Sequence, residues 1–282
     1  MRLGGPVSYG EGDFEAYAFG HLKKGYKAAY APGGISAGQT AEINKYKEVM
    51  KKHDIVTAEV GTWCNPLSRD EGEAKKNVDF IIERLALADE LEACVCVNII
   101  GTWHETHWFA PCADNFSQEF FDAAVEVYRK IIDAVKPTRT KMSFEIMPYC
   151  FLDSAREYER FVRAVDRKAA GVHFDPINCI NNPRDFFDNA QFFAEAFDIF
   201  ARLGVGSMHL KDLAIRNEPP SVMFDEVRIG AGGVDYVSLM RQMNKLPADT
   251  PAMLEHLESE DEYDLAAEVV RNCAARAGTK II

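Results

Sequence analysis

The stretch KMSFEIMP, residues 141–148, is a short apolar run that carries a single acid, Glu145, near its end. Three later short apolar runs each end near a polar residue of the same kind or an imidazole: GVHFDPIN with Asp175, VGSMHLKD with His209 and PAMLEHLE with Glu255. The four polar residues are separated by 30, 34 and 46 positions. One strand-plus-helix unit of a (β/α)₈ barrel takes about 30 residues. The spacing therefore predicts successive barrel strands, with one short unmarked strand in the last gap.

Strands and helices alternate along the whole chain. The run ACVCVNIIG, residues 93–101, is continuously apolar or small, which is typical of a parallel strand buried on both faces. Other strands are predicted at YKAAYAP (26–32, as the first strand), 55–63, 142–148, 171–176, 205–210 and 252–257, and helices at 11–23, 41–54, 70–91, 117–135, 153–166, 186–203, 236–245 and 261–277. This alternation predicts an α/β fold with a parallel sheet.

A (β/α)₈ TIM barrel forming one domain over residues 1–282 is the preferred architecture, and a doubly wound open sheet is its rival. No glycine-rich GxGxxG follows an early strand, so the rival lacks its phosphate-binding fingerprint. No linker, low-complexity tract or internal repeat divides the chain. We therefore expect a single domain.

Composition narrows the functional classes. The formal net charge of −12 disfavours binding to nucleic acid, because such binding depends on Lys and Arg neutralising phosphates. No apolar run approaches the roughly 18 residues of a membrane helix, and the first residues lack the pattern of a secretory signal. The seven cysteines form no CxxC pair and are expected to be reduced, mostly buried thiols. We expect a cytoplasmic protein.

The four polar strand-end residues have the chemistry of a metal site. Side chains alternate across a strand, so Glu145, Asp175, His209 and Glu255 can all point into the barrel. Buried carboxylates need a partner or a cation, and three acids with one imidazole suit a hard divalent ion: Mn²⁺ first, with Mg²⁺ or Co²⁺ as alternatives. Singly, each acid could instead cap a helix or join an ion pair.

The 16-residue loop GTWHETHWFAPCADNF, residues 101–116, is a second candidate region. Loops of this length in a compact barrel are usually functional. His104, His107 and Trp108, together with Trp103, could form a wall for a sugar or supply an acid or base. The alternative is a packed surface loop whose aromatic side chains cover the top of the barrel.

Three further polar residues follow the marked strands. Lys211 lies two residues beyond His209 and could hold an oxyanion; otherwise it forms a salt bridge. Arg228 stands beside the glycines of VRIGAGGVDY, which let the backbone approach a ligand or simply turn tightly. Asn178 could support the Asp175 region through its amide or could cap the following helix.

The segments EIMP, HFDP, MHLKD, RIGAGGVDY and MLEH resemble the strand ends of the xylose-isomerase-like barrel superfamily, which includes ketose 3-epimerases. The resemblance covers nearly the whole chain. It implies that Glu145, Asp175, His209 and Glu255 bind one divalent metal, and that the two glutamates are catalytic proton-transfer groups. The implied activity is a sugar isomerase or epimerase that abstracts a proton next to a carbonyl. We also expect an oligomer.

Two departures from the epimerase pattern disfavour a simple free ketose as substrate. Phe151 stands where the ketose epimerases usually have a second Glu, and Asn178 where they have a His. The segments DPINCINNPRDFF and ADNFS are also similar to the catalytic subunits of C-glycoside deglycosidases. That resemblance implies a lyase acting on 3-oxo-glycosides together with a small β-rich partner subunit. The apolar residues Met147, Tyr149 and Phe151, with Trp103 and Trp108, would suit such a bulkier substrate.

Two other functional classes are weighed against a sugar enzyme. A nuclease acting on abasic DNA would need more metal-ligating His and a basic groove, whereas the chain has seven His and a negative charge. A noncatalytic sugar-binding or scaffold barrel would use the four polar residues as a structural ion-pair network. The metal-dependent isomerase or epimerase is the preferred hypothesis.

Overall fold

The computed structural model describes residues 1–10, 12–218 and 220–282. In this part of the chain, parallel strands form a closed barrel in the order β1-β10-β7-β6-β5-β4-β3-β2. The strands are β1 (Arg2–Gly4), β2 (Ala28–Tyr30), β3 (Val56–Gly61), β4 (Val95–Ile99), β5 (Lys141–Glu145), β6 (Ala170–Phe174), β7 (Val205–Leu210) and β10 (Pro251–Leu254). The predicted eight-stranded TIM barrel and single domain are confirmed.

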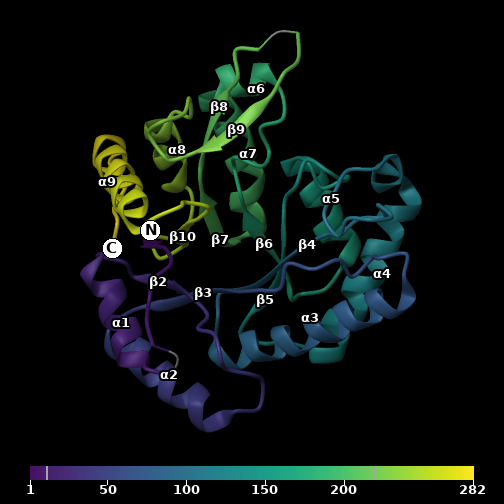
Figure 1. Ribbon diagram of the computed structural model, residues 1–282, viewed down its shortest axis with the longest axis horizontal. Helices are drawn as coiled ribbons and strands as arrows, with labels where there is room; N and C mark the ends of the chain where they lie inside the picture. The colour runs from purple at the N-terminus through teal and green to yellow at the C-terminus, as the bar shows by residue number, and fades with distance from the viewer. Residues whose placement is uncertain (11, 219) are drawn as a thin grey trace.

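The helices lie around the outside of the barrel (Figure 1). They are α1 (Phe14–Lys23), α2 (Thr40–Lys52), α3 (Glu71–Leu91), α4 (Gln118–Val135), α5 (Ala155–Val165), α6 (Pro183–Phe187), α7 (Asn189–Leu203), α8 (Tyr236–Met243) and α9 (Glu260–Ala277), with a short 3₁₀ turn at Ala113–Phe116. Several begin where a side chain accepts a hydrogen bond from the first turn, as Asp70, Ser117, Ser154 and Ser259 do. None of the described helices is long and apolar enough to cross a membrane.

Two sequence predictions of the barrel strands are wrong. The first strand is β1 at Arg2–Gly4, and residues 26–32 hold the second strand. The last gap holds no barrel strand among its described residues, because β7 pairs directly with β10. The gap holds an antiparallel hairpin instead, formed by β8 (Asp212–Ile215) and β9 (Phe224–Val227), which projects from the barrel (Figure 1).

The helix predicted over 186–203 is two helices. Asn182 caps α6 and Pro183 occupies its first turn, and the chain then breaks at Asp188 before α7. The helix predicted over 11–23 begins at Phe14, and residue 11 lies outside the described residues. Capping side chains and proline set these helix boundaries, and the spacing of apolar residues along the sequence does not reveal them.

Asp89 ties α3 to the turn before β5. Its carboxylate accepts hydrogen bonds from the backbone N–H groups of residues 138, 139 and 140 at 2.7, 2.6 and 3.2 Å, and from the Arg139 guanidinium at 3.0 Å. Burial opposes ionisation of Asp89, but these hydrogen bonds outweigh it and lower its pKa below the ordinary 3.8. The ionised carboxylate therefore stabilises the folded state at neutral pH.

We expect Asp89→Asn to lower the free energy of unfolding by about 1–2 kcal/mol at neutral pH. A carboxyl whose pKa is lowered by folding stabilises above its unfolded pKa and loses that effect as the pH falls through the folded value. The deficit should therefore shrink towards about pH 3. Urea unfolding at both pH values measures it. Asp79→Asn, which removes an exposed pair with Lys75, is the control and should change stability by about 0.5 kcal/mol or less.

Candidate metal centre

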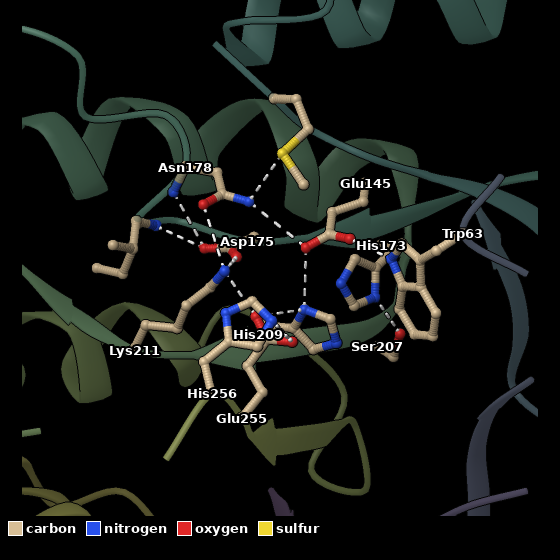
Figure 2. A network of polar contacts seen from close by, with 12 residues as sticks. Trp63, Glu145, His173, Asp175, Asn178, Ser207, His209, Lys211, Glu255 and His256 are labelled. Atoms are coloured by element: carbon tan, nitrogen blue, oxygen red, sulfur yellow. Dashed lines mark hydrogen bonds and ion pairs between the residues drawn. The ribbon is translucent and has the colours of Figure 1, made fainter. Parts of the chain in front are cut away.

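Four side chains from successive barrel strands meet at one end of the barrel. Glu145 ends β5, Asp175 directly follows β6, His209 lies in β7 and Glu255 directly follows β10. These strands are neighbours in the order β5, β6, β7, β10, so residues distant in sequence become adjacent. One donor atom from each of the four lies within 4.8 Å of the others. Figure 2 shows them grouped around a common centre.

The hydroxyl of Tyr158, in α5, fixes the ends of β5 and β6. It donates to the carbonyl of Phe144 at 2.7 Å and accepts from the backbone N–H of Phe144 and of His173, at 3.0 and 3.1 Å. It also lies 3.2 Å from the carbonyl oxygen of Gly171. This buried hydroxyl therefore links the two strands immediately before Glu145 and Asp175 leave the barrel wall.

Two basic side chains neutralise the acids. Nδ1 of His209 is 2.9 Å from Oε1 of Glu255 and 3.2 Å from Oε1 of Glu145. Nζ of Lys211 is 2.8 Å from Oδ2 of Asp175 and 2.7 Å from Oε1 of Glu255. All of these side chains are almost wholly buried; that of Glu255, the most exposed, is 10% accessible. Low local polarisability strengthens such contacts relative to water.

The local charges set the protonation states. Burial opposes protonation of His209, but the surrounding Glu255 and Glu59 outweigh it and raise its pKa well above 6.5. Burial likewise opposes the charge of Lys211, whose pKa is nevertheless raised by Asp175 and Glu255. Burial opposes ionisation of Glu255, yet its pKa is lowered by His209 and Lys211. Ionised carboxylates and two cations therefore coexist at neutral pH.

The donor set fits a divalent cation. Oδ2 of Asp175 and Oε1 of Glu255 are buried and make no hydrogen bond in the described part of the chain, although Nζ of Lys211 lies close to both. Buried carboxylate oxygens grouped with one imidazole nitrogen match the ligand preference of hard ions such as Mg²⁺ and Mn²⁺. A cation at this position would replace the attraction that His209 and Lys211 supply.

A cavity of about 440 Å³ adjoins the cluster on the side away from the barrel interior. Of the four clustered residues, Glu145 and Glu255 line it. Its other walls are largely aromatic and apolar: Pro6, Tyr30, Trp63, Ile99, Trp108, Phe109, Met147, His256 and Tyr263. Nε1–H of Trp63 donates to Oε2 of Glu145 at 2.6 Å, which holds this carboxylate at the cavity wall.

The remaining predicted residues divide into two groups. Lys211 and Asn178 join the cluster: Nζ of Lys211 donates to Oδ1 of Asn178 at 3.3 Å, and Nδ2 of Asn178 donates to Oε1 of Glu145 at 3.4 Å. Trp108 lines the cavity. Arg228 donates to the carbonyl of Ile229 and, among the described residues, makes no ion pair with the three acids of the cluster.

His104 and His107 lie elsewhere. Their rings are 5.3 Å apart, and His104 faces a different surface hollow beside Arg69 and Trp103. Phe151 is not in the cavity wall either, because it packs in the core against Phe121 and Phe161. In the expected apolar wall, Trp108 and Met147 line the cavity, whereas Trp103, Tyr149 and Phe151 do not.

Among the residues that touch the cluster or cavity, sequence reasoning missed Glu59, Trp63, His256 and Tyr30. Glu59 stands within the apolar run VTAEVG and carries the same signal that identified Glu145, an acid inside an otherwise apolar strand. Its carboxylate is fully buried, 3.4 Å from Nε2 of His209. Trp63 closes the same predicted strand. No local pattern marks Tyr30 or His256.

The comparisons with known proteins agree with this architecture. The family model described as xylose isomerase-like TIM barrel matches residues 24–273. The chain belongs to this family. No curated protein sequence matches the xylose isomerase-like chain significantly.

Solved structures share the xylose isomerase-like fold at low sequence identity. A xylose isomerase-like TIM barrel protein from Mycobacterium smegmatis in complex with magnesium is 15% identical, with a TM-score of 0.65 over 97% of this chain and 95% of that one. 3-Keto-D-glucoside 4-epimerase from E. coli is 13% identical, with a TM-score of 0.69 over 98% of this chain and 99% of that one. D-Psicose 3-epimerase from Clostridium cellulolyticum H10, solved with D-tagatose, is 14% identical, with a TM-score of 0.66 over 98% of this chain and 99% of that one.

Proposed function

We propose that the protein is a divalent-metal-dependent sugar isomerase or epimerase that moves a proton at the carbon next to a carbonyl. The observation that carries the proposal is the meeting of Glu145, Asp175, His209 and Glu255 beside a cavity of about 440 Å³. Several structurally similar proteins have names that describe them as sugar epimerases, which supports a sugar as the substrate class.

The geometry divides the four residues by role. Asp175 and His209 are fully buried beneath the cavity, so we assign them to holding the ion. Glu145 and Glu255 reach the cavity wall, so they can contact both the ion and a substrate. A bound divalent ion would polarise the carbonyl and offset negative charge on its oxygen. Mn²⁺ is the first choice, with Mg²⁺ or Co²⁺ as alternatives.

The two glutamates are the proposed acid and base. Burial opposes the ionisation of each glutamate, but the neighbouring His209 outweighs it and lowers the pKa of both. Both are therefore ionised near neutrality and able to accept a proton. One removes the proton next to the carbonyl, and the same or the other returns a proton to that carbon. Trp63 orients Glu145 through its indole N–H. Asn178 and Lys211 contact Glu145 and Glu255 respectively, so we assign them to orienting these two carboxylates and, with them, substrate oxygens.

A lyase acting on 3-oxo-glycosides is the second candidate. The aromatic wall formed by Trp63, Trp108, Phe109 and Tyr263 favours it, because a sugar that carries an aromatic group would bury more apolar surface there than a free ketose. The same proton removal then leads to departure of a substituent instead of reprotonation. A small β-rich partner subunit belongs to this second candidate.

The test combines metal analysis with a substrate panel. Protein stripped with a chelator and reloaded with Mn²⁺, Mg²⁺ or Co²⁺ is incubated in D₂O with free ketoses and with 3-oxo-glucosides. We expect one ion per chain and deuterium at the carbon next to the carbonyl, with an epimer or a released aglycone as product. Stripped protein is the control. The proposal is refuted if the protein binds no divalent metal, or if none of the sugars takes up deuterium.

A further inference from the structure

A second polar layer lies directly beneath the metal centre, inside the barrel. It contains Glu59 from β3, His173 from β6 and Ser207 and His209 from β7, and all four side chains are fully buried. Interior positions of such barrels are usually filled by branched apolar side chains. A charged residue at this depth therefore needs a specific explanation.

Glu59 faces His209 from below. Its Oε1 is 3.4 Å from Nε2 of His209, and its Oε2 is 3.6 Å from Nδ1 of His173. Neither Glu59 oxygen makes a hydrogen bond in the described part of the chain, and neither does Nε2 of His209. By contrast, Nδ1 of His173 lies 2.6 Å from Oγ of Ser207 and so has a closer partner (Figure 2).

The two ring nitrogens of His209 therefore face different acids. Nδ1 faces the acids of the metal centre at 2.9 and 3.2 Å, whereas Nε2 faces Glu59. As a metal ligand His209 would be a neutral imidazole, which has one N–H and one lone pair, and the acceptor beside one nitrogen decides which nitrogen keeps the proton. A proton on Nε2, next to Glu59, leaves the Nδ1 lone pair directed at the centre.

We propose that Glu59 is a positioning residue that fixes the ring and tautomer of His209 for metal binding. The inference rests on the proposed function, because it assigns His209 as a ligand. Carboxylates that accept the second N–H of a ligating His commonly raise metal affinity by holding the ring in place. Here the carboxylate comes from β3, on the opposite side of the closed barrel from β7, and has no other polar partner closer than His209 among the described residues.

The same side chains could instead hold a second ion, since donor atoms of Glu59, His173 and His209 lie within 4.8 Å of one another. Two observations favour the positioning role. His209 would have to bind an ion through each nitrogen, which requires a ring with no proton. The Nδ1 atom of His173 is already engaged by Ser207. A second ion is therefore an outcome that would overturn the proposal.

The test measures Mn²⁺ affinity by calorimetry in stripped protein. We expect Glu59→Leu to weaken binding by about 10- to 100-fold. Glu59→Gln, which keeps a weaker acceptor, should fall between this variant and the wild type, weakening binding about three- to tenfold. Thermal unfolding of the stripped proteins is the second readout. Glu59 contributes to the raised pKa of His209, so its loss is expected to lower the melting temperature; a melting temperature that stays above the titration temperature shows that unfolding does not cause the loss of affinity.

Ser143→Ala is the matched control, since Ser143 is an equally buried polar residue whose hydroxyl has no partner in the described chain. Its Mn²⁺ affinity should stay within about twofold of wild type. If Glu59→Leu does not fold, Glu59→Gln decides: affinity within twofold of wild type overturns the inference.

The possible failures are distinguishable. Wild-type protein that binds no Mn²⁺ overturns the proposed function and this inference with it. Wild-type binding with unchanged affinity in the Glu59 variants overturns the inference alone. Two ions per chain, reduced to one in His173→Phe, would make Glu59 a ligand and also overturn it.

Discussion

Glu145→Gln is expected to reduce turnover of the substrate identified by the panel by about 10³- to 10⁴-fold. Loss of a general acid or base costs about 10²- to 10⁴-fold, and this variant also weakens a charged metal ligand. The amide has nearly the same shape but only one acceptor oxygen, so either the indole N–H of Trp63 or the side-chain amide of Asn178 loses its acceptor. The measurements are steady-state turnover and deuterium exchange at the reacting carbon, at saturating Mn²⁺.

Glu83→Gln is the control for this prediction. Glu83 is a partly buried glutamate on α3 that accepts a hydrogen bond from the backbone N–H of Ala37, remote from the cluster. Its turnover should match the wild type within about twofold. If Glu145→Gln retains both bound metal and wild-type turnover, Glu145 is neither an essential ligand nor a proton-transfer group, and the assignment of catalysis to this residue is wrong.

Tyr158→Phe is expected to lower the free energy of unfolding by about 2–4 kcal/mol. The substitution removes one oxygen atom and leaves the backbone N–H groups of Phe144 and His173, with the carbonyl of Phe144, short of a buried partner. Urea unfolding of stripped protein measures the loss. Because these groups fix the ends of β5 and β6, Mn²⁺ affinity should fall as well.

Tyr26→Phe gives the matched comparison. Tyr26 is also fully buried, but its hydroxyl has no hydrogen-bond partner among the described residues. Removing that oxygen should leave stability within about 0.5 kcal/mol or raise it. Equal losses for both tyrosines would show that the hydroxyl of Tyr158 contributes nothing specific to the junction of β5 and β6.

The sequence predicts the barrel well because its strands and helices have distinct apolar periods. The strand of residues 93–101 is continuously apolar, and the helix over 117–135 has one apolar face, so both are found where expected. β1 escapes prediction because three residues, one of them Gly4, are too few to show a period. Strands β8 and β9 escape because their pairing depends on contacts outside the barrel.

The site is predictable only where a residue stands out from its own strand. Glu145 and Asp175 do so, and the order of the strands then brings them together. The residue type of His104 and His107 favours a role in a site. The path of the long loop that carries them, however, is set by tertiary packing, which the spacing of apolar residues does not describe. The cavity wall has contributions from many elements, which explains why Tyr30 and Tyr263 carry no local signal.

The hairpin of β8 and β9 interrupts the chain between two strands that pair as if it were absent, with Met208 opposite Ala252 and His209 opposite Met253. It reaches the mouth through Glu226, which lies 3.6 Å from Nζ of Lys211 and 2.9 Å from Nδ1 of His256. The hairpin can therefore be changed without altering the register in which β7 and β10 pair. Laboratory evolution could exchange it for arms of other lengths to alter which molecules are admitted, while the reacting groups stay anchored in the wall.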